Sequence, residues 1–151
     1  MSNEKIGILL LSHGSRLDDG EEVIKAYKEM YLKEFPEAVV EYGFMEIRKP
    51  GIPETINKLT KDNDLDKIIV VPVFVAHGLH TKRDIPHLLG IESDFEEEHH
   101  HSHEHHHHHH HHHDHEEEEE FEFDGEIILT EPLGIDNRIY EVIRDRISQY
   151  L

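Results

Sequence analysis

The sequence predicts a flavodoxin-like α/β fold: an open parallel sheet of about four strands, flanked by helices, in a single domain. Two near-continuous apolar runs, at residues 6–11 and 68–75, are typical of strands buried on both faces of a parallel sheet. Strand-like and helix-like segments alternate along the chain, which favours a doubly wound sheet with right-handed crossovers. The 151 residues are enough for one domain, 1–151, with a real hydrophobic core.

The first half of the chain predicts two strands and two helices. Residues 5–12 and 38–45 are the expected strands, and Pro53 suits the first turn of a short helix that follows the second strand. The longer helix starts at Asp18 or Asp19 and ends before Pro36. Its broad apolar face consists of Val23, Ile24, Tyr27, Met30, Tyr31 and Leu32. The face of the short helix consists of Ile52, Ile56 and Leu59.

The second half predicts two further strands and a closing helix. Residues 67–75 and 126–130 are the expected strands, and residues 81–90 read as a loop with about one helical turn. Residues 135–151 predict a helix. Its inward face consists of Ile139, Val142, Ile143 and Ile147.

Residues 92–124 differ sharply in amino-acid composition from the rest of this domain. They hold 14 of the 34 acidic residues and 14 of the 18 histidines, with no Lys or Arg. Such a segment buries too little apolar surface to offset its chain entropy, so we expect a disordered His/Glu-rich insertion. The remaining chain carries 20 acidic against 15 basic residues, so it has no overall electropositive footprint for nucleic acid.

Several classes of protein are disfavoured by what the sequence lacks. The absence of cysteine excludes disulfides, thiolate metal sites and Cys nucleophiles. No apolar run approaches a membrane span, and no signal-peptide pattern precedes the first strand, so we expect a soluble cytoplasmic protein. The glycine-rich signatures of nucleotide sites and the serine-hydrolase elbow are also missing.

Histidines follow two of the predicted strands. His13 follows the first strand, and His77 and His80 follow the third. Ligands of open α/β sheets bind beyond the carboxyl ends of the strands, so these imidazoles are candidates for metal binding or proton transfer. A simple turn cap at His13, or solvent-exposed loop histidines at the other two positions, would give the same pattern. Gly78 favours a turn between His77 and His80, in which case one of them faces the site.

The same edge of the sheet is expected to carry a carboxylate and a basic rim. Glu46 ends the second strand, although a solvated strand terminus is the common fate of such a residue. A cluster of bases on a net acidic protein suits a substrate with several carboxylates or phosphates, although surface scatter would also produce it. The basic residues in these loops are Arg16, Arg48, Lys49, Lys82 and Arg83.

A run of nine histidines within the insertion is suited to binding Ni²⁺, Co²⁺, Cu²⁺ or Zn²⁺ in almost any conformation. A neutral low-complexity expansion is the alternative explanation. A flexible chain holds no fixed open coordination geometry, so the run is a poor catalytic site and is better read as an accessory metal tract. Its members are His105, His106, His107, His108, His109, His110, His111, His112 and His113.

Three segments together resemble the class II chelatases of tetrapyrrole biosynthesis, and among them the small archaeal sirohydrochlorin cobaltochelatases, which in methanogens also act as nickelchelatases. The segments are SHGS, FMEIRKPGIPE and PVFVAHGLHTKRDIP, at residues 12–15, 44–54 and 72–86. The resemblance covers nearly the whole chain, including TEPLG at 130–134. It implies insertion of Co²⁺ or Ni²⁺, as substrate metal, into sirohydrochlorin for cobalamin or coenzyme F430 biosynthesis. No permanently bound cofactor is expected.

The resemblance also implies roles for individual residues. His13 and His80 would bind the incoming metal, His13 would accept a proton from the macrocycle, and Glu46 would lie beside it. His77 lies at a position that varies in the family and is not assigned as a ligand. Larger relatives hold two such lobes, so a homodimer with inward-facing clefts is expected. The tetrapyrrole site would be lined by Lys49, Val75, Ala76, His77, Gly78, Leu79 and His80, and the basic rim would grip the substrate carboxylates.

Two other functions remain open at this point. The histidine tract could make the protein a nickel or cobalt storage protein or metallochaperone. Alternatively, the first strand–helix loop, with its histidine and arginine, is compatible with an FMN- or phosphate-binding module. The choice among nickel, cobalt and iron is not decided by imidazole and carboxylate ligands, which accept all three.

Overall fold

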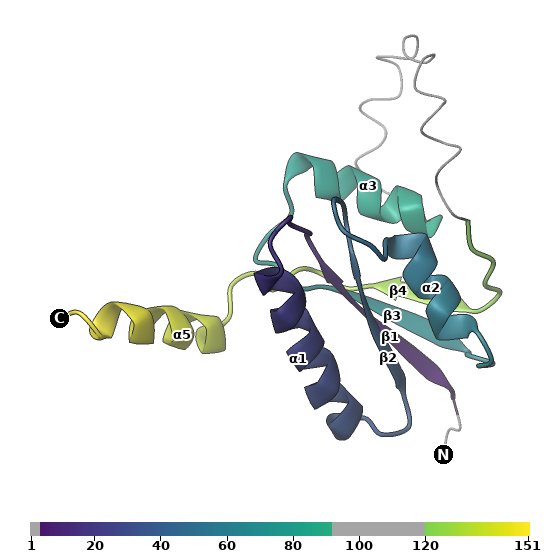
Figure 1. The fold of residues 1–151 in the computed structure, drawn as a ribbon, viewed down its shortest axis with the longest axis horizontal. Coiled ribbons are helices and arrows are strands. Elements are labelled where there is room, and N and C mark those ends of the chain that lie inside the picture. Colours follow the sequence, from purple (N-terminus) through teal and green to yellow (C-terminus); the bar gives the residue numbers. More distant parts are fainter. Residues whose placement is uncertain (1–3, 92–119) are drawn as a thin grey trace, which may run out of the picture.

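A four-stranded parallel sheet forms the centre of the molecule in a computed structural model, which describes residues 4–91 and 120–151 (Figure 1). The strands lie in the order β2-β1-β3-β4, and all three neighbouring pairs are parallel. This confirms the predicted fold class. The elements are β1 (Ile6–Ser12), α1 (Asp19–Glu34), β2 (Val39–Phe44), α2 (Ile52–Thr60), β3 (Lys67–Pro72), α3 (Leu79–Leu89), β4 (Glu126–Leu129) and α5 (Asn137–Ser148).

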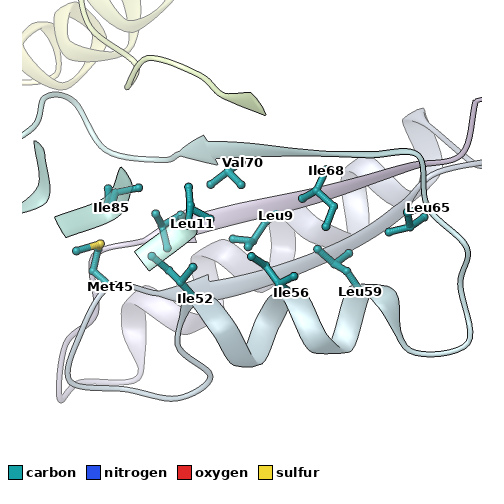
Figure 2. Close-up of a cluster of buried hydrophobic side chains, with 11 residues drawn as sticks. Leu9, Leu11, Met45, Ile52, Ile56, Leu59, Leu65, Ile68, Val70 and Ile85 are labelled. Carbon is teal, nitrogen blue, oxygen red and sulfur yellow. The ribbon is translucent and has the colours of Figure 1, made fainter. Parts of the chain in front are cut away.

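The main hydrophobic core lies between the sheet and helices α2 and α3 (Figure 2). Side chains alternate across the sheet, so Leu9 and Leu11 of β1 point to this core, as do Ile68 and Val70 of β3. All four are fully buried. The helices contribute Ile52, Ile56, Leu59, Ile85 and Leu89. The predicted apolar side of the short helix is therefore confirmed.

The opposite face of the sheet is covered only in part. Helix α1 packs Ile24 against Leu10, Val40 and Phe44 in a smaller cluster, and Ile24 is its only buried residue. The face expected for this helix was broader, but most of its members are exposed: Val23, Tyr27, Met30 and Tyr31. Beside α1, the outer face of β3 is half-buried, so the expectation of strands buried on both faces holds for one face only.

The prediction of an inward-facing closing helix was wrong. Helix α5 has no buried residue and points away from the sheet (Figure 1). Val142, Ile143 and Ile147, expected to face inward, are 50–55% exposed. Amphipathic spacing identified the apolar side of the helix but carried no information about the direction in which the chain leaves β4.

Residues 81–89 form most of a regular helix, α3, and Gly90 is its C-cap, which corrects the prediction of a loop for residues 81–90. Gly78 is its N-cap, and the Thr81 hydroxyl accepts a hydrogen bond from the Gly78 amide at 3.0 Å. Ile85 and Leu89, four residues apart, are buried on its inner side. Pro86 lies inside this helix, where the packing of the inner side against the core outweighs the one lost backbone hydrogen bond.

The end of the histidine-rich segment also differs from the expectation. Phe121 and Phe123 pack against the main core, and the side-chain amide of Asn57 donates to the Glu120 backbone carbonyl at 3.0 Å. The two phenylalanine rings in this acidic stretch thus attach residues 120–123 to the folded domain. The rest of the expected disordered insertion, residues 92–119, lies outside the described residues, and so does the tract from His105 to His113. Within 4–91 and 120–151, no helix is both long and apolar enough to cross a membrane.

Candidate functional site

The site lies at the carboxyl edge of the sheet, where β1, β2 and β3 end. Parallel pairing continues past the strands: the Met45 amide donates to the Ser12 carbonyl at 2.9 Å, and the Glu46 amide donates to the His13 carbonyl at 3.2 Å. These bonds place the residues after β1 and β2 side by side. Two candidates that are 33 positions apart in the sequence, His13 and Glu46, thereby become neighbours.

Gly14 makes this close approach possible. Its φ of 107° is a conformation that other residues rarely adopt. A side chain there would also collide with the backbone carbonyl of Glu46. The glycine that follows the first histidine is therefore required by the contact between the two loops, and it fixes the position from which the imidazole projects.

His13 and Glu46 form an accessible acid–base pair. The distance from His13 Nδ1 to Glu46 Oε2 is 3.9 Å, and the side chains are 53% and 41% exposed. This distance is longer than that of a hydrogen bond, so the two side chains are neighbours with room between them. The imidazole can therefore bind an incoming metal ion or accept a proton, with a carboxylate beside it to pass the proton on.

The backbone immediately after Glu46 is strained. Ile47, a β-branched residue, has a φ of 74°, and the Arg48 amide donates to the Glu46 carbonyl at 2.8 Å across it. This arrangement is a γ-turn with a positive φ at its central residue, which is the rare and strained form of that turn. The Ile47 side chain is 59% exposed, so burial of its own side chain does not explain the conformation. Strain of this kind concentrates at functional sites, where surrounding contacts maintain it.

Arg48 supplies such contacts. Its guanidinium donates to the carbonyls of Ser15 and Leu17 at 3.1 and 3.0 Å, and to carboxylate oxygens of Asp18 and Glu21 at 2.9 Å each. The hydrogen bond to Asp18 contributes most to raising the pKa of Arg48. Arg48 was expected among possible substrate contacts, but its donors join the loop after β2 to the loop after β1.

A third residue anchors this network to the sheet. The Tyr42 hydroxyl on β2 donates to Glu21 Oε2 at 2.7 Å. This bond is the main reason that the pKa of Glu21 lies below its ordinary value and that the pKa of Tyr42 is raised to about 12. The network therefore fixes the start of α1 relative to β2.

The loop after β3 brings an aromatic ring between two imidazoles. Phe74 makes edge-on contacts with His13 and with His77, at centroid distances of 5.9 and 5.8 Å. His77 Nδ1 lies 3.0 Å from the Thr81 hydroxyl oxygen. Burial, aided by the nearby Lys82 charge, lowers the pKa of His77, which favours its neutral form. His77 is thus a half-buried residue of the loop after β3, next to the exposed residues Val75, Ala76 and Gly78.

The remaining basic candidates are largely exposed around this edge. Lys49 is 78% exposed and lies 3.6 Å from Glu54 Oε2, and Arg83 Nε lies 3.3 Å from Asp84 Oδ1. Arg16 and Lys82 are exposed. Weak exposed pairs of this kind leave the cations available to an anionic ligand.

The second predicted metal ligand, His80, occupies the second position of α3. Its side chain, like that of Leu79, is outside what the structure describes. Among the described residues, no group of three or more His, Asp or Glu could hold a metal ion. The described part of this edge therefore contains no complete metal-binding site formed by three or more of these residues. The predicted metal ligands are His13 and His80.

Sequence reasoning missed three residues of the site: Phe74, Ile47 and Thr81. The spacing of Gly78 and Thr81 is compatible with a helix cap, and could have indicated that α3 begins there. Phe74 reads as an ordinary strand residue, and nothing in the local sequence signals the positive φ of Ile47.

Comparisons with known proteins agree with this architecture. A family model described as CbiX matches residues 7–150. The chain is 55% identical over 144 residues to the sirohydrochlorin cobaltochelatase of Methanothermobacter thermautotrophicus, covering 95% of this chain and 92% of that one. It is 44% identical over 147 residues to the enzyme of the same name from Methanopyrus kandleri, covering 97% of both.

Solved structures share the fold at lower identity. A putative cobalamin biosynthesis CbiX protein from Marinobacter aquaeolei superposes with a TM-score of 0.61 at 24% identity, covering 97% of this chain and 94% of that one. The sirohydrochlorin chelatase SirB from Bacillus subtilis, solved in complex with cobalt, gives a TM-score of 0.66 at 21% identity. There the match covers 97% of this chain but 51% of SirB.

Proposed function

The chain belongs to the CbiX family, and on that premise we propose that it is a sirohydrochlorin cobaltochelatase, an enzyme that inserts Co²⁺ into sirohydrochlorin. Relatives that share 44–55% identity over nearly the full length carry this name. The observation that carries the proposal to particular residues is the exposed His13–Glu46 pair at the sheet edge, 3.9 Å apart.

The chemistry of metal insertion matches these groups. The metal must lose water, and the macrocycle must lose two pyrrole N–H protons. In our proposal His13 and His80 bind the incoming ion, and two nitrogen ligands leave coordination positions open for the ring nitrogens. As the ion passes to the ring nitrogens, His13 is released from it and accepts the two pyrrole protons in turn, and Glu46 relays each of them to solvent.

Binding of the macrocycle uses the surrounding loops. We assign its wall to Lys49 and residues 75–80, with Phe74 as a rigid support behind His13. Arg16, Lys82 and Arg83 are placed to attract the carboxylates of sirohydrochlorin. We assign Arg48 to positioning the site, because its donors are already used by protein acceptors.

We extend the proposal to Ni²⁺ as a second substrate metal. Imidazole and carboxylate ligands accept both ions, and nickel binds such sites at least as strongly as cobalt. The enzyme would then serve coenzyme F430 as well as cobalamin biosynthesis. We also propose a homodimer with inward-facing clefts, which is consistent with the chain matching half of SirB.

The test is a metal-insertion assay with purified protein and sirohydrochlorin. Absorbance changes are followed with Co²⁺, Ni²⁺ and Fe²⁺ separately. We expect His13→Ala and His80→Ala to fall to the uncatalysed rate, and Glu46→Gln to lower kcat about 100-fold. His87→Ala is the matched control, because His87 is exposed two turns further along α3. Full activity in both His13→Ala and His80→Ala would refute the site.

The nine-histidine tract favours a second candidate function, storage or delivery of nickel or cobalt. In the chelatase proposal, the histidine tract binds metal ions and delivers them to the site at the sheet edge. In the storage alternative the folded domain has no turnover, so the same assay separates the two.

A further inference from the structure

Ile47 combines an exposed apolar side chain with a strained backbone, directly beside Glu46. We propose that this side chain packs against the apolar ring face of the tetrapyrrole, which makes Ile47 a substrate contact that determines specificity. The inference rests on the proposed function, because it takes sirohydrochlorin as the ligand. It assigns to Ile47 the selection of a broad macrocycle over smaller ligands that carry the same charged groups.

The backbone of Ile47 is fixed from both sides. The Glu46 amide donates to the His13 carbonyl at 3.2 Å, and the Arg48 amide donates to the Glu46 carbonyl at 2.8 Å. The Arg48 guanidinium is held in turn by the Leu17 carbonyl at 3.0 Å. These hydrogen bonds account for the φ of 74° at Ile47. They do not account for the isoleucine, because glycine adopts a positive φ without strain.

The side chain of Ile47 must therefore have a use of its own. A β-branched residue at a positive φ is an outlier whose strain lowers the stability of the folded chain. The side chain is 59% exposed, so packing inside the protein offsets this strain only in part. A ligand that covers the exposed part supplies the missing contact, since burial of apolar surface is favourable.

Exposed aliphatic residues occur on all three loops that meet at this edge of the sheet. Leu17 follows β1, Ile47 follows β2 and Val75 follows β3, and each is at least 59% exposed. A small anion such as phosphate would be held by the basic residues and would use none of these side chains. A ligand with a wide apolar surface uses them all.

The order of residues after β2 matches the chemistry of a tetrapyrrole. Glu46 comes first, Ile47 is next to it, and Lys49 lies two residues further on with 78% of its side chain exposed. Sirohydrochlorin has its exchangeable N–H protons at the centre, an apolar ring around them, and acetate and propionate groups at the periphery. Proton acceptor, apolar side chain and cation therefore follow one another in the same order as the groups that they would meet.

The inference predicts opposite effects of Ile47→Gly on stability and on binding. Glycine relieves the strain, so we expect the melting temperature to rise by about 3 °C. The same substitution removes the apolar contact, so we expect the dissociation constant for metal-free sirohydrochlorin to rise about 10-fold. A residue with only a backbone role would leave this dissociation constant unchanged.

Two further variants separate the apolar contact from backbone freedom. Ile47→Leu keeps the apolar area, so we expect an affinity close to that of the wild type. Ile47→Asn introduces a polar side chain that tolerates a positive φ, so we expect the same loss as in Ile47→Gly. Val23→Asn is the matched control, because Val23 is a β-branched residue that is 55% exposed on α1.

Binding is measured by titrating metal-free sirohydrochlorin, whose fluorescence reports its environment, with full-length protein in EDTA. Circular dichroism gives the melting temperatures. Equal dissociation constants for wild type, Ile47→Gly and Ile47→Asn would overturn this inference and leave the proposed function intact. A wild type that binds no sirohydrochlorin would overturn both. If Ile47→Gly fails to fold, the comparison of Ile47→Leu with Ile47→Asn decides, and equal affinities of these two variants would overturn the inference.

Discussion

At the scale of single residues, the site depends on how closely two loops approach each other. His13 and Glu46 are the groups proposed to supply the chemistry. Gly14 allows their backbones to meet, since a side chain there would overlap the Glu46 carbonyl. Ile47 adds strain that Arg48 helps to maintain. The reactive groups are thus held in place by neighbours that have no chemical role of their own.

The importance of Gly14 can be tested by a pair of glycine variants. Gly14→Ala forces either a strained φ or separation of the two loops, so we expect a loss of stability of at least about 2 kcal/mol. We also expect a larger loss of chelatase activity than the stability change explains, because the imidazole moves relative to Glu46. Urea denaturation and the insertion assay measure the two effects.

Gly20→Ala is the control. Gly20 lies in α1 with open space around it, so alanine should stabilise the protein by up to about 1 kcal/mol. Equal effects of the two substitutions would show that the contact of Gly14 with the Glu46 loop has no energetic consequence.

At the scale of elements, β2 and α1 are joined by the Tyr42–Glu21–Arg48 network. The Tyr42 hydroxyl and the Arg48 guanidinium both donate to the Glu21 carboxylate, at 2.7 and 2.9 Å. The network sets the position of the loop that carries His13 relative to the loop that carries Glu46. A local ion-pair network therefore controls the geometry of the edge.

Tyr42→Phe should lower the free energy of unfolding by about 1 kcal/mol, with a defined pH profile. The pKa of Glu21 is lowered in the folded state, so its contribution is present above its unfolded value of about 4.5 and is lost as the pH falls through the lower folded value. The pKa of Tyr42 is raised to about 12, so its contribution fades as the pH rises from 10 towards 12. The difference between wild type and variant should therefore be greatest between these limits.

Chemical denaturation at several pH values measures this profile. Tyr27→Phe removes a hydroxyl from an exposed ring of α1 and should show no such profile. A pH-independent difference for Tyr42→Phe would mean that the hydrogen bond to the Glu21 carboxylate contributes nothing to stability.

At the scale of the whole molecule, acidic residues and histidines are concentrated in one stretch of the sequence, apart from the residues to which the proposal assigns the chemistry. The net charge of −19 is concentrated in residues 92–124, while basic residues gather around the site. A histidine-rich segment inserted after α3, the helix that contains His80, is well placed along the chain to raise the local metal concentration.

Replacing residues 93–118 with a short Gly-Ser linker tests this role. The boundaries retain Glu120, Phe121 and Phe123, which contact the folded domain. We expect normal turnover at saturating Co²⁺ or Ni²⁺ and a reduced rate when metal is scarce. Initial rates as a function of metal concentration measure the effect, with a His→Ser tract of the same length as control. Loss of all turnover at saturating metal would contradict the feeder role.

The sequence by itself determined the architecture, and it indicated the edge of the sheet at which the candidate site is expected. Apolar runs and helical spacing are local properties, so the order of all the strands and helices except α3 follows from them, with boundaries shifted by up to three residues. The carboxyl ends of parallel strands share one edge, so His13 and Glu46 could be expected to meet there. The CbiX family was also identifiable from three short segments.

Only the tertiary structure decided which groups are available and which surfaces are covered. Arg48 resembled its basic neighbours until its partners in the β1–α1 loop were known, and Phe74 resembled any strand residue until its ring was found between two imidazoles. Core packing made α3 a helix across Pro86, and the hydrogen bonds of Leu133 and Gly134 turned α5 away from its sheet. Each of these outcomes depends on contacts between residues far apart in the chain, which local sequence patterns do not encode.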